Sequence, residues 1–597
     1  MVDRDKREAQ EAIQEEMAAS SKGKSRWEDL WKKEDWWANW LGGFLLLLGL
    51  IFFWGSAPQG LEPRVQEKQA IIEAEEERAP FETITQIEAQ EELEALQARE
   101  KGIGAGLTRF LQRPHGWEDS PLKSFYMSES EAAQMRAEAQ PRYEEAQERT
   151  RQARVAAEEA EARAAAANFQ DEQLNNEANQ AISEWKAART AESRAQSAAN
   201  VQGYNVFFTL LLLMIGTGLL FAIGIKFMGG NVGAFFVGYP VVFIISIIGV
   251  FIGRHAIAAE YGLSYVLWCI IIGLLISNTI GTPKFVKPAV QTEYYIKTGL
   301  VLLGGSILFG LILMIGAPGI VVAWVVTPTV LIVGYWVGDK YIKLPSKPLN
   351  ICVAAASSVC GVSAAIAAAA ASKAKGEELT IAVGLSLVFT ALFMFLMPAF
   401  VLAVGMNPIL GGAWIGGTVD STGAVVASGE LLGPGAMYVA ATLKMIQNVM
   451  IGILAFAIAA YWAIKVEREG SSVQLTFGAA MHEIWTRFPK FVLGFAAASI
   501  IFTIIYQLLG SELGQAIISD GALRGWANPL RAWFFAMAFT SIGLATNFRE
   551  LAKYFAGGKI LYHYVFTQGL NIVLTLIVAW LMFMVVFPGI TEHLMTL

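Results

Sequence analysis

Residues 350–372 read NICVAAASSVCGVSAAIAAAAAS, and this stretch decides the fold class that the sequence predicts. It is long enough to cross a bilayer as a helix, which takes roughly 20 residues. An interrupted membrane helix exposes backbone N–H groups at the start of its second half, where an anion can bind. The alternative is that small residues only let neighbouring helices pack closely. The residues that interrupt this stretch with hydroxyls, a thiol and a helix-weakening glycine are Ser357, Ser358, Cys360, Gly361 and Ser363.

A second apolar stretch, residues 528–547, has a similar pattern and reads NPLRAWFFAMAFTSIGLATN. It places Thr540 and Ser541 shortly before a glycine, as the first stretch places its serines before Gly361. Each stretch also begins near a Pro-Leu pair. Two interrupted apolar segments in corresponding parts of a chain are typical of a transporter binding site. The two stretches are therefore expected to contribute to a transporter binding site.

The composition is typical of a polytopic membrane protein. Of 597 residues, 54% are hydrophobic and 16% are charged, and the apolar runs predict about 13 transmembrane helices. The formal net charge of −7 gives no indication of nucleic-acid binding. The three cysteines and five histidines form no metal or disulfide pattern. No nucleophile–base pair, metal motif or phosphate loop indicates an enzyme or a cofactor.

The N-terminal region predicts the orientation in the membrane. Residues 1–37 are polar and are expected to form a cytoplasmic tail, and residues 38–56 an uncleaved transmembrane anchor. Lysine and arginine gather before the anchor, and the later loops alternate between rich and poor in these residues. The positive-inside rule then puts the N-terminus in the cytoplasm. We expect a multi-pass protein of the bacterial plasma (inner) membrane that lies in the lipid bilayer and forms a homo-oligomer.

Residues 57–200 differ from the rest of the chain. They are rich in Glu, Ala, Gln and Arg, and acidic residues outnumber basic ones by 28 to 17. The pattern predicts helices over about 61–100 and 128–200, the second on the order of 100 Å long. Its alanine-rich faces favour coiled-coil packing, as a hairpin or between protomers. This extracytoplasmic helical domain either binds a protein partner or is a solvated spacer.

The remaining chain predicts an inverted repeat. Residues 201–256 provide additional transmembrane helices, residues 257–404 a first transporter repeat and residues 405–597 a second. Each repeat is expected to hold five crossings with the interrupted helix as the fourth, and loop charges give the repeats opposite orientations. After the anchor, the expected crossings are 205–226, 231–253, 262–280, 298–316, 317–338, 350–372, 378–404, 411–428, 434–464, 488–508, 526–546 and 560–588.

Polar residues within these crossings are candidates for function, because they are costly at membrane depth. Asp420 has Thr418 and Ser421 beside it, and Lys444 has Asn448 about one turn later on the same face. Asp420 and Lys444 are expected to approach each other. When paired they stabilise the fold; when unpaired, Lys444 attracts an anion and Asp420 binds a proton or Na⁺. The alternative is that either residue lies at a helix end and faces water.

Three motifs resemble those of the sulfate exporter family of YeiH-like membrane proteins. They are SSVCGVSA at 357–364, GTVDST at 417–422 with VVASG at 425–429, and Lys444-Met445 in its apolar helix. With weaker matches at 274–279 and 541–546, they span about 262–590, more than half of the chain. The family is similar in fold to the bile-acid-sodium-symporter and sodium–proton-antiporter group.

This resemblance implies an all-helical five-plus-five inverted repeat, two broken helices that cross at the midplane, and an elevator-like motion. It implies transport of sulfate, sulfite or a related small anion between the two broken helices. The expected substrate ligands are Ser357, Ser358, Cys360, Gly361, Ser363, Thr418, Lys444, Thr540 and Ser541, and the residues expected to couple transport to Na⁺ or H⁺ are Asp420, Ser421 and Asn448.

The sequence departs from the family pattern at Asp420, Ser421, Ala424 and Gln447, where a His, an acidic residue, a Gln and a basic residue are usual. These changes remove positive charge and donors from the expected site. Bicarbonate or an organic acid is therefore an alternative substrate. A Na⁺/H⁺ antiporter is another alternative, since a lone membrane acid is suggestive of one. A different class is a scaffold or sensor that acts through residues 57–200.

Overall fold

The computed structural model is almost entirely helical in the residues that it describes, which are 27–55, 61–94, 102–307, 309–466, 481–482, 485–486, 488–551 and 558–595. Most of the predicted tail lies outside these residues. Among those described, eight helices are long and apolar enough to cross a membrane, which confirms a multi-pass membrane protein. The total of 13 crossings stays a prediction. The eight are α3 (Glu34–Gly55), α9 (Phe207–Phe227), α10 (Val232–Gly253), α14 (Phe309–Val337), α17 (Gly376–Ala403), α20 (Pro434–Tyr461), α22 (Phe491–Leu509) and α26 (Lys559–Trp580).

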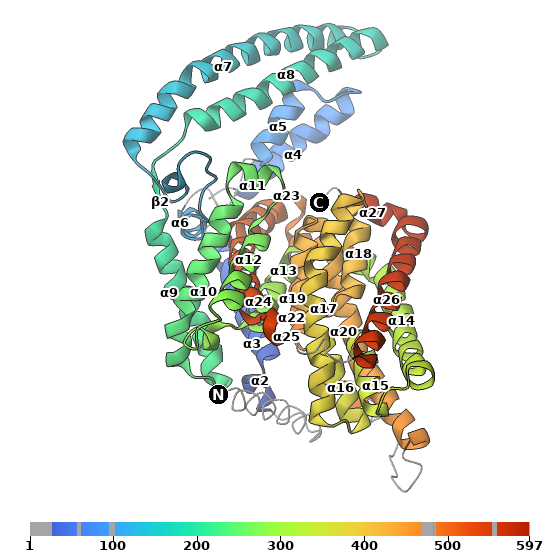
Figure 1. The fold of residues 1–597 in the computed structure, drawn as a ribbon. Helices are drawn as coiled ribbons and strands as arrows, with labels where there is room; N and C mark the ends of the chain where they lie inside the picture. The colour runs from blue at the N-terminus through green and yellow to red at the C-terminus, as the bar shows by residue number, and fades with distance from the viewer. Residues whose placement is uncertain are drawn as a thin grey trace.

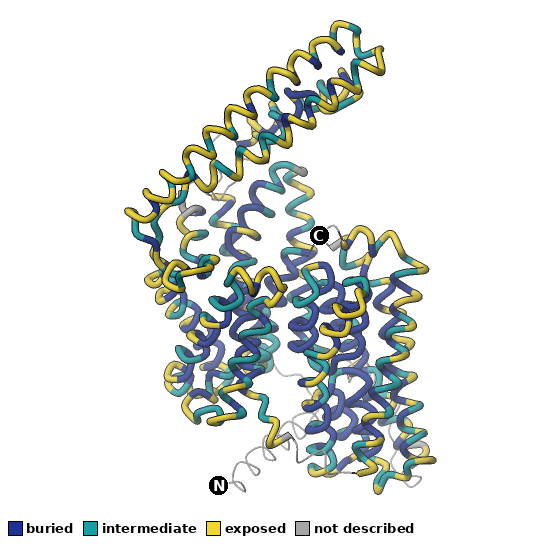
Figure 2. The backbone as a smooth tube through the Cα atoms, turned by 45° about the horizontal axis from the view of Figure 1, so that its top comes forward, coloured by how far each residue is buried: buried dark blue, intermediate teal, exposed yellow. Residues whose placement is uncertain are grey.

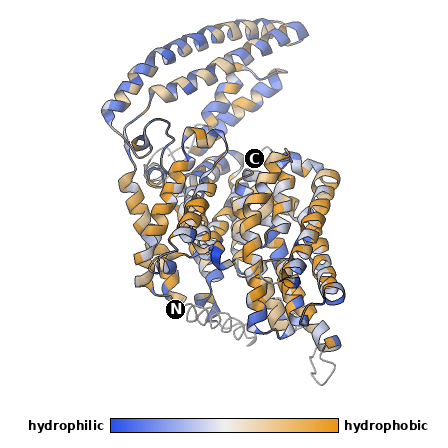
Figure 3. Ribbon diagram, in the orientation of Figure 1, coloured by the Kyte–Doolittle hydropathy of each residue, from blue (hydrophilic) through white to orange (hydrophobic). Residues whose placement is uncertain are grey.

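The helices form two bundles that lie side by side (Figure 1). We call the one around α3, α9, α10 and α22 the anchor bundle, and the one around α14, α17, α20 and α26 the hairpin bundle. Both are largely apolar and buried inside (Figures 2 and 3). The anchor bundle also holds α12 (Tyr265–Thr279), α13 (Thr292–Ser306), η5 (Gly514–Ala527) and α24 (Asn528–Ala545). The hairpin bundle also holds α15 (Lys347–Ala356), α16 (Gly361–Ser372), α18 (Pro408–Thr418), α19 (Thr422–Glu430) and α27 (Pro588–Met595).

A hydrophilic helical arm lies above the bundles, at the end opposite to the start of α3 (Figures 1 and 3). The helical stretch expected over 128–200 is a hairpin, one of the two packings expected for it, because Asn168 and Phe169 adopt positive φ angles of 49° and 56° and reverse the chain. Two antiparallel helices result, and Trp185 is buried between them and the preceding helix. The short strands β1 (Tyr126–Met127) and β2 (Tyr204–Asn205) pair at its base. The arm helices are α4 (Leu61–Arg78), α5 (Ile84–Glu94), α7 (Glu129–Ala166) and α8 (Glu172–Ala199).

The boundary expected between residues 316 and 317 is also wrong. The helix break comes at Ser306, and α14 continues through Pro318 and Pro328. A Cβ on Gly304 would lie 2.3 Å from the carbonyl oxygen of Phe495, so α13 and α22 pack backbone to backbone here. The Ser499 hydroxyl donates to the Ile307 carbonyl at 2.5 Å, which satisfies a group freed by the break.

Residues 350–372 do not form one interrupted crossing. Instead, α15 and α16 pack antiparallel as a hairpin whose tip is 357–360. The Ser346 hydroxyl before α15 bonds to Glu378 in the first turn of α17, so α15 and α17 start at the same end of the bundle. Cys352 lies against Ser372 at the end of α16, as it must if the chain has turned back. Hydropathy over this length fits a crossing and a hairpin equally well.

Residues 411–428, expected to be one crossing, form a second hairpin. Along α18, a Cβ on Gly412 would lie 2.4 Å from the Ala436 carbonyl oxygen and one on Gly416 2.7 Å from that of Ala440, so α18 runs parallel to α20. The helix α19 runs antiparallel to α20, because Gly429 near the end of α19 lies against Met437 near the start of α20. The tip is 419–421. The two hairpins enter the bundle from opposite ends (Figure 1).

The second interrupted helix expected at 526–546 is not interrupted, because α24 is one continuous helix. Its Gly543 allows close packing instead: a Cβ there would lie 2.4 Å from the Ile270 carbonyl oxygen of α12. The Thr540 hydroxyl bonds to Ser246 of α10 at 3.0 Å. The small residues of α24 thus serve helix packing inside the anchor bundle, and the expected pair of crossing helices is replaced by two hairpins.

Candidate functional site

The tips of the two hairpins touch each other in the middle of the hairpin bundle. A Cβ on Gly361, the first residue of α16, would lie 2.9 Å from Cβ of Ser386 and 3.2 Å from Cβ of Asp420. Only glycine leaves room for this approach. The first hairpin, the second hairpin and α17 therefore meet at one point.

Lys444 of α20 joins the two tips. Its ammonium donates to the carbonyl of Val359 and, at 2.7 Å, to Oε1 of Gln447. The Gln447 amide in turn donates to the carbonyls of Ser358 and Gly417, each at 3.1 Å. Lys444 is fully buried. Its bond to the Val359 carbonyl holds the ammonium at the tip that follows the C-terminus of α15.

Asp420 lies at the tip of the second hairpin and faces α26. Its Oδ2 accepts a hydrogen bond from the Tyr564 hydroxyl at 2.5 Å and one from Ser386 at 3.3 Å. Among the residues that the structure describes, no ion pair within 4.0 Å joins Asp420 to Lys444, although the two lie close enough to interact electrostatically. Asp420 and Lys444 therefore approach each other, as expected, without forming an ion pair in this conformation.

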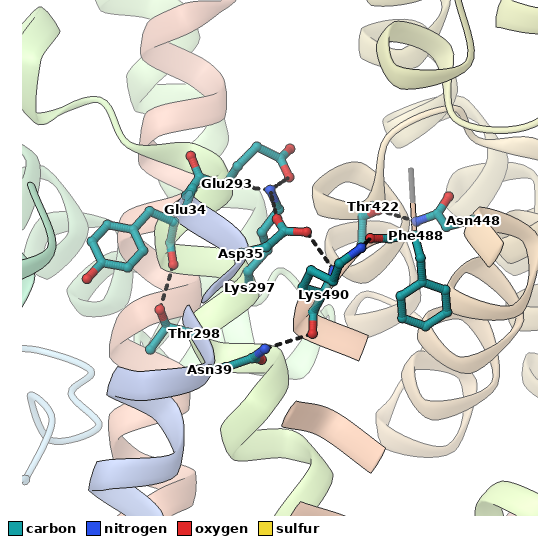
Figure 4. Close-up of polar contacts among 11 residues, drawn as sticks. Glu34, Asp35, Asn39, Glu293, Lys297, Thr298, Thr422, Asn448, Phe488 and Lys490 are labelled. Carbon is teal, nitrogen blue, oxygen red and sulfur yellow. Dashed lines mark hydrogen bonds and ion pairs between the residues drawn. The ribbon is translucent and has the colours of Figure 1, made fainter. Parts of the chain in front are cut away.

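A cavity of about 840 Å³ opens between the two bundles and reaches both hairpins. On the side of the hairpin bundle it is lined by Cys360, Ser363, Thr422 and Asn448; the Asn448 amide donates to the Thr422 hydroxyl at 3.1 Å (Figure 4). Both α16 and α19 begin here, and in the part of the chain that the structure describes neither N-cap side chain, Cys360 or Ser421, bonds to the first N–H groups. Free N–H groups at a helix N-terminus attract anions. The N-termini of α16 and α19, both partly positive, therefore lie at the surface of the cavity.

The opposite wall of the cavity is charged. Lys297 of α13 forms ion pairs with Glu34 at 2.7 Å and with Asp35 at 2.9 Å, both from the start of α3 (Figure 4). Lys490, just before the span α22, donates its backbone N–H to Asp35 at 2.8 Å. Burial, with a smaller effect from Lys33, lowers the pKa of Lys490 to about 8. The N-terminal segment of the chain thus forms one wall of the cavity.

The structure brings most of the sequence-predicted site residues together. Ser357 and Ser358 lie at the first tip, bonded to Thr567 and to the Ala355 carbonyl. Thr540 and Ser541 lie in the anchor bundle, apart from the residues that line the cavity. The residues at the first tip or its cavity face are Ser357, Ser358, Cys360, Gly361 and Ser363; those at the second tip or on α20 are Thr418, Asp420, Ser421, Lys444 and Asn448.

Sequence reasoning missed the polar face of α26. Tyr564, Thr567, Gln568 and Asn571 are buried against the two tips. The Gln568 amide donates to the Thr418 carbonyl at 3.0 Å, and the Asn571 amide donates to that of Ser357 at 2.9 Å. The signal was present, because these residues recur three or four positions apart in an apolar segment and so share one helix face.

Comparison with known proteins identifies the family. Residues 237–564 match the family model described as Conserved hypothetical protein 698. Two proteins of Nitratidesulfovibrio vulgaris, each named UPF0324 membrane protein, are 52% and 51% identical to this chain over 96% of its length and 98% of theirs. The chain belongs to the UPF0324 family of membrane proteins. The UPF0324 inner membrane protein YeiH of Escherichia coli is 25% identical over 51% of this chain and 82% of its own length. No solved structure matches the chain.

Proposed function

We propose that this UPF0324 protein is a secondary transporter of a small inorganic anion, sulfate or sulfite being the first candidates. The observation that carries the proposal is the cavity that ends at the uncapped N-termini of α16 and α19. Each terminus is equivalent to roughly half a positive charge, so the two together balance about one negative charge. The hydroxyls of Ser363 and Thr422 at the cavity surface add hydrogen-bond donors for an oxyanion.

Alternating access would come from movement of the hairpin bundle against the anchor bundle. The chain order supports this: α15, α16 and α17 form a hairpin followed by a long helix from one end, and α18, α19 and α20 form the same unit from the other end. Such inverted units are typical of secondary transporters. Where α19 faces the anchor bundle, a Cβ on Gly423 would lie 3.4 Å from Ile542 and 3.9 Å from Ile296. An apolar contact of this kind can slide without breaking hydrogen bonds.

The proposal includes a location. With the N-terminus in the cytoplasm of a bacterial inner membrane, the cavity, which is walled by the start of α3, opens to the cytoplasm. The helical arm then lies outside the cytoplasm, where it is free to meet a partner or a second protomer.

The test is uptake of radiolabelled sulfate by proteoliposomes that contain the full chain, with sulfite, bicarbonate and chloride as competitors. Ser363→Asp places a carboxylate at the third residue of α16, where an acidic residue suits the helix but occupies the anion position. The neutral, nearly isosteric Ser363→Asn is the matched control. We expect saturable uptake in the wild type and in Ser363→Asn, and none in Ser363→Asp. Equal uptake by the two variants would reject the site, and no uptake of any anion by folded protein would reject the function.

A further inference from the structure

Three buried oxygen atoms beside the second hairpin tip lack hydrogen-bond partners within the described residues. They are Oδ1 of Asp420, Oγ1 of Thr418 and Oε1 of Gln568. The three residues are neighbours where the tip meets α26, because the Gln568 amide bonds to the Thr418 carbonyl at 3.0 Å and Tyr564, one turn earlier on α26, bonds to Asp420 at 2.5 Å. All three residues are at least 97% buried. Leaving several buried acceptors unpaired is costly, and native proteins rarely do so.

The carboxylate of Asp420 also lacks a direct ion pair in the described part of the chain. A buried carboxylate is expected to have a partner of opposite charge, but the nearby ammonium of Lys444 is bonded to the Val359 carbonyl and to Gln447 instead. The helix α18 ends here, and its C-terminus adds partial negative charge. At the first hairpin, the cation Lys444 donates to the carbonyl of Val359 in the tip that follows α15. Within the described ranges, the side chains that donate to the end of α18 are the neutral amides of Gln447 and Gln568.

We propose that the second hairpin tip binds a Na⁺ ion through Asp420, Thr418 and Gln568, on the side that faces α26, and that this ion is coupled to the anion. Oxygen ligands from a carboxylate, a hydroxyl and an amide suit a small hard cation, and half-helix C-termini hold coupling ions in other transporters. A proton would neutralise Asp420 but would leave the other oxygen atoms without a ligand. The coupling rests on the proposed function; the binding of Na⁺ does not.

The two ions would occupy opposite sides of the same tip. The C-terminus of α18 faces the cation, and the N-terminus of α19 faces the cavity and the anion. The other ionisable groups that face Asp420 are Tyr564 from α26, Lys444 from α20 and Cys360 from the first tip. A bound Na⁺ removes the negative charge of Asp420 from the vicinity of the anion, so each ion favours the binding of the other.

The test measures Na⁺ binding without any transported anion. The melting temperature of the purified full chain is recorded at increasing NaCl, with KCl and choline chloride at equal ionic strength and constant pH. We expect a saturable rise with Na⁺ alone, lost in Asp420→Asn and in Gln568→Leu. The matched control is Asp520→Asn, because Asp520 is a buried aspartate of the anchor bundle with its own partner Arg524 at 2.7 Å. That variant should keep the Na⁺ response.

Identical melting temperatures in the three salts would overturn the proposal, as would a Na⁺ response that survives in both site variants. A rise on acidification in choline chloride, with no effect of Na⁺, would assign the site to a proton and reject Na⁺. If Asp420→Asn does not fold, Thr418→Val and equilibrium binding of ²²Na⁺ to the wild type decide the question. A protein that binds Na⁺ but transports no anion would keep the site and reject the proposed function.

Discussion

Replacing Gly361 with alanine should force the two hairpin tips apart. The new methyl group would lie 1.8 Å from Oγ of Ser386, 2.9 Å from its Cβ and 3.2 Å from Cβ of Asp420. The hydroxyl of Ser386 can rotate away, at the loss of its bond to Asp420, but Cβ of Ser386 is fixed to α17. Overpacking of this kind costs about 1–3 kcal/mol, which should lower the melting temperature by about 1–2 °C in a chain of this length.

The assay is thermal unfolding of the purified chain in detergent, together with sulfate uptake. Gly569→Ala on α26 is the matched control, because a Cβ there meets nothing within 4 Å and alanine is the better helix former by roughly 0.5–1 kcal/mol. Adding Ser386→Gly to Gly361→Ala removes the two nearest contacts and should recover most of the lost stability. If Gly361→Ala melts with the wild type and transports normally, the tips do not meet as described.

Three further outcomes follow from the structure. Lys444→Met leaves the Val359 carbonyl and Oε1 of Gln447 without their donor, at a cost of about 1–3 kcal/mol for each group, so it should lower the melting temperature and abolish uptake. The control Lys226→Met, at an exposed position of α9, should do neither. Unchanged uptake by Lys444→Met would contradict the role of Lys444 at the tips. Because the pKa of Lys490 is lowered to about 8, its charge is present at pH 7 and lost above pH 8. Sulfate uptake should therefore fall as the pH on the cavity side rises through about 8, and Lys490→Arg should remove this pH dependence. A pH profile that Lys490→Arg leaves unaltered would contradict the role of the Lys490 charge. Since Met127 pairs with Tyr204, replacing residues 128–203 with Asn-Gly should close a tight hairpin between the two strands and leave sulfate uptake intact. A folded but inactive product would show that the arm takes part in transport.

Hydropathy predicts the multi-pass membrane class, and polar residues at membrane depth predict the approach of Asp420 and Lys444 to each other. They do not predict the hairpins. A segment of the length of 350–372 satisfies the bilayer either as one crossing or as two short antiparallel helices, and the choice is made by contacts such as that of Cys352 with Ser372. Those contacts join residues whose pairing leaves no periodic signal in the sequence.

The similarity between 357–361 and 540–543 was misleading for a physical reason. Hydroxyls followed by glycine serve both a helix break and a close helix contact, and in α24 Gly543 serves the contact with Ile270. The structural counterpart of the first hairpin is instead the segment around Asp420. The glycines of this segment allow it to pack closely against α20. Tyr564 and Gln568 were overlooked because hydropathy averages hide a polar stripe on a long apolar helix.

The most direct test of the central account uses the native thiol of Cys360. Of the three cysteines, Cys269 and Cys352 are buried, and Cys360 is partly exposed and lines the cavity at the N-terminus of α16. The measurement is the rate at which a small neutral maleimide labels Cys360 in the wild-type protein, with increasing sulfate at constant ionic strength. An anion held between the two helix N-termini should slow the labelling in a saturable manner, and the same concentrations of chloride should not. Labelling that no anion slows, in folded protein, would contradict an anion site at the hairpin tips.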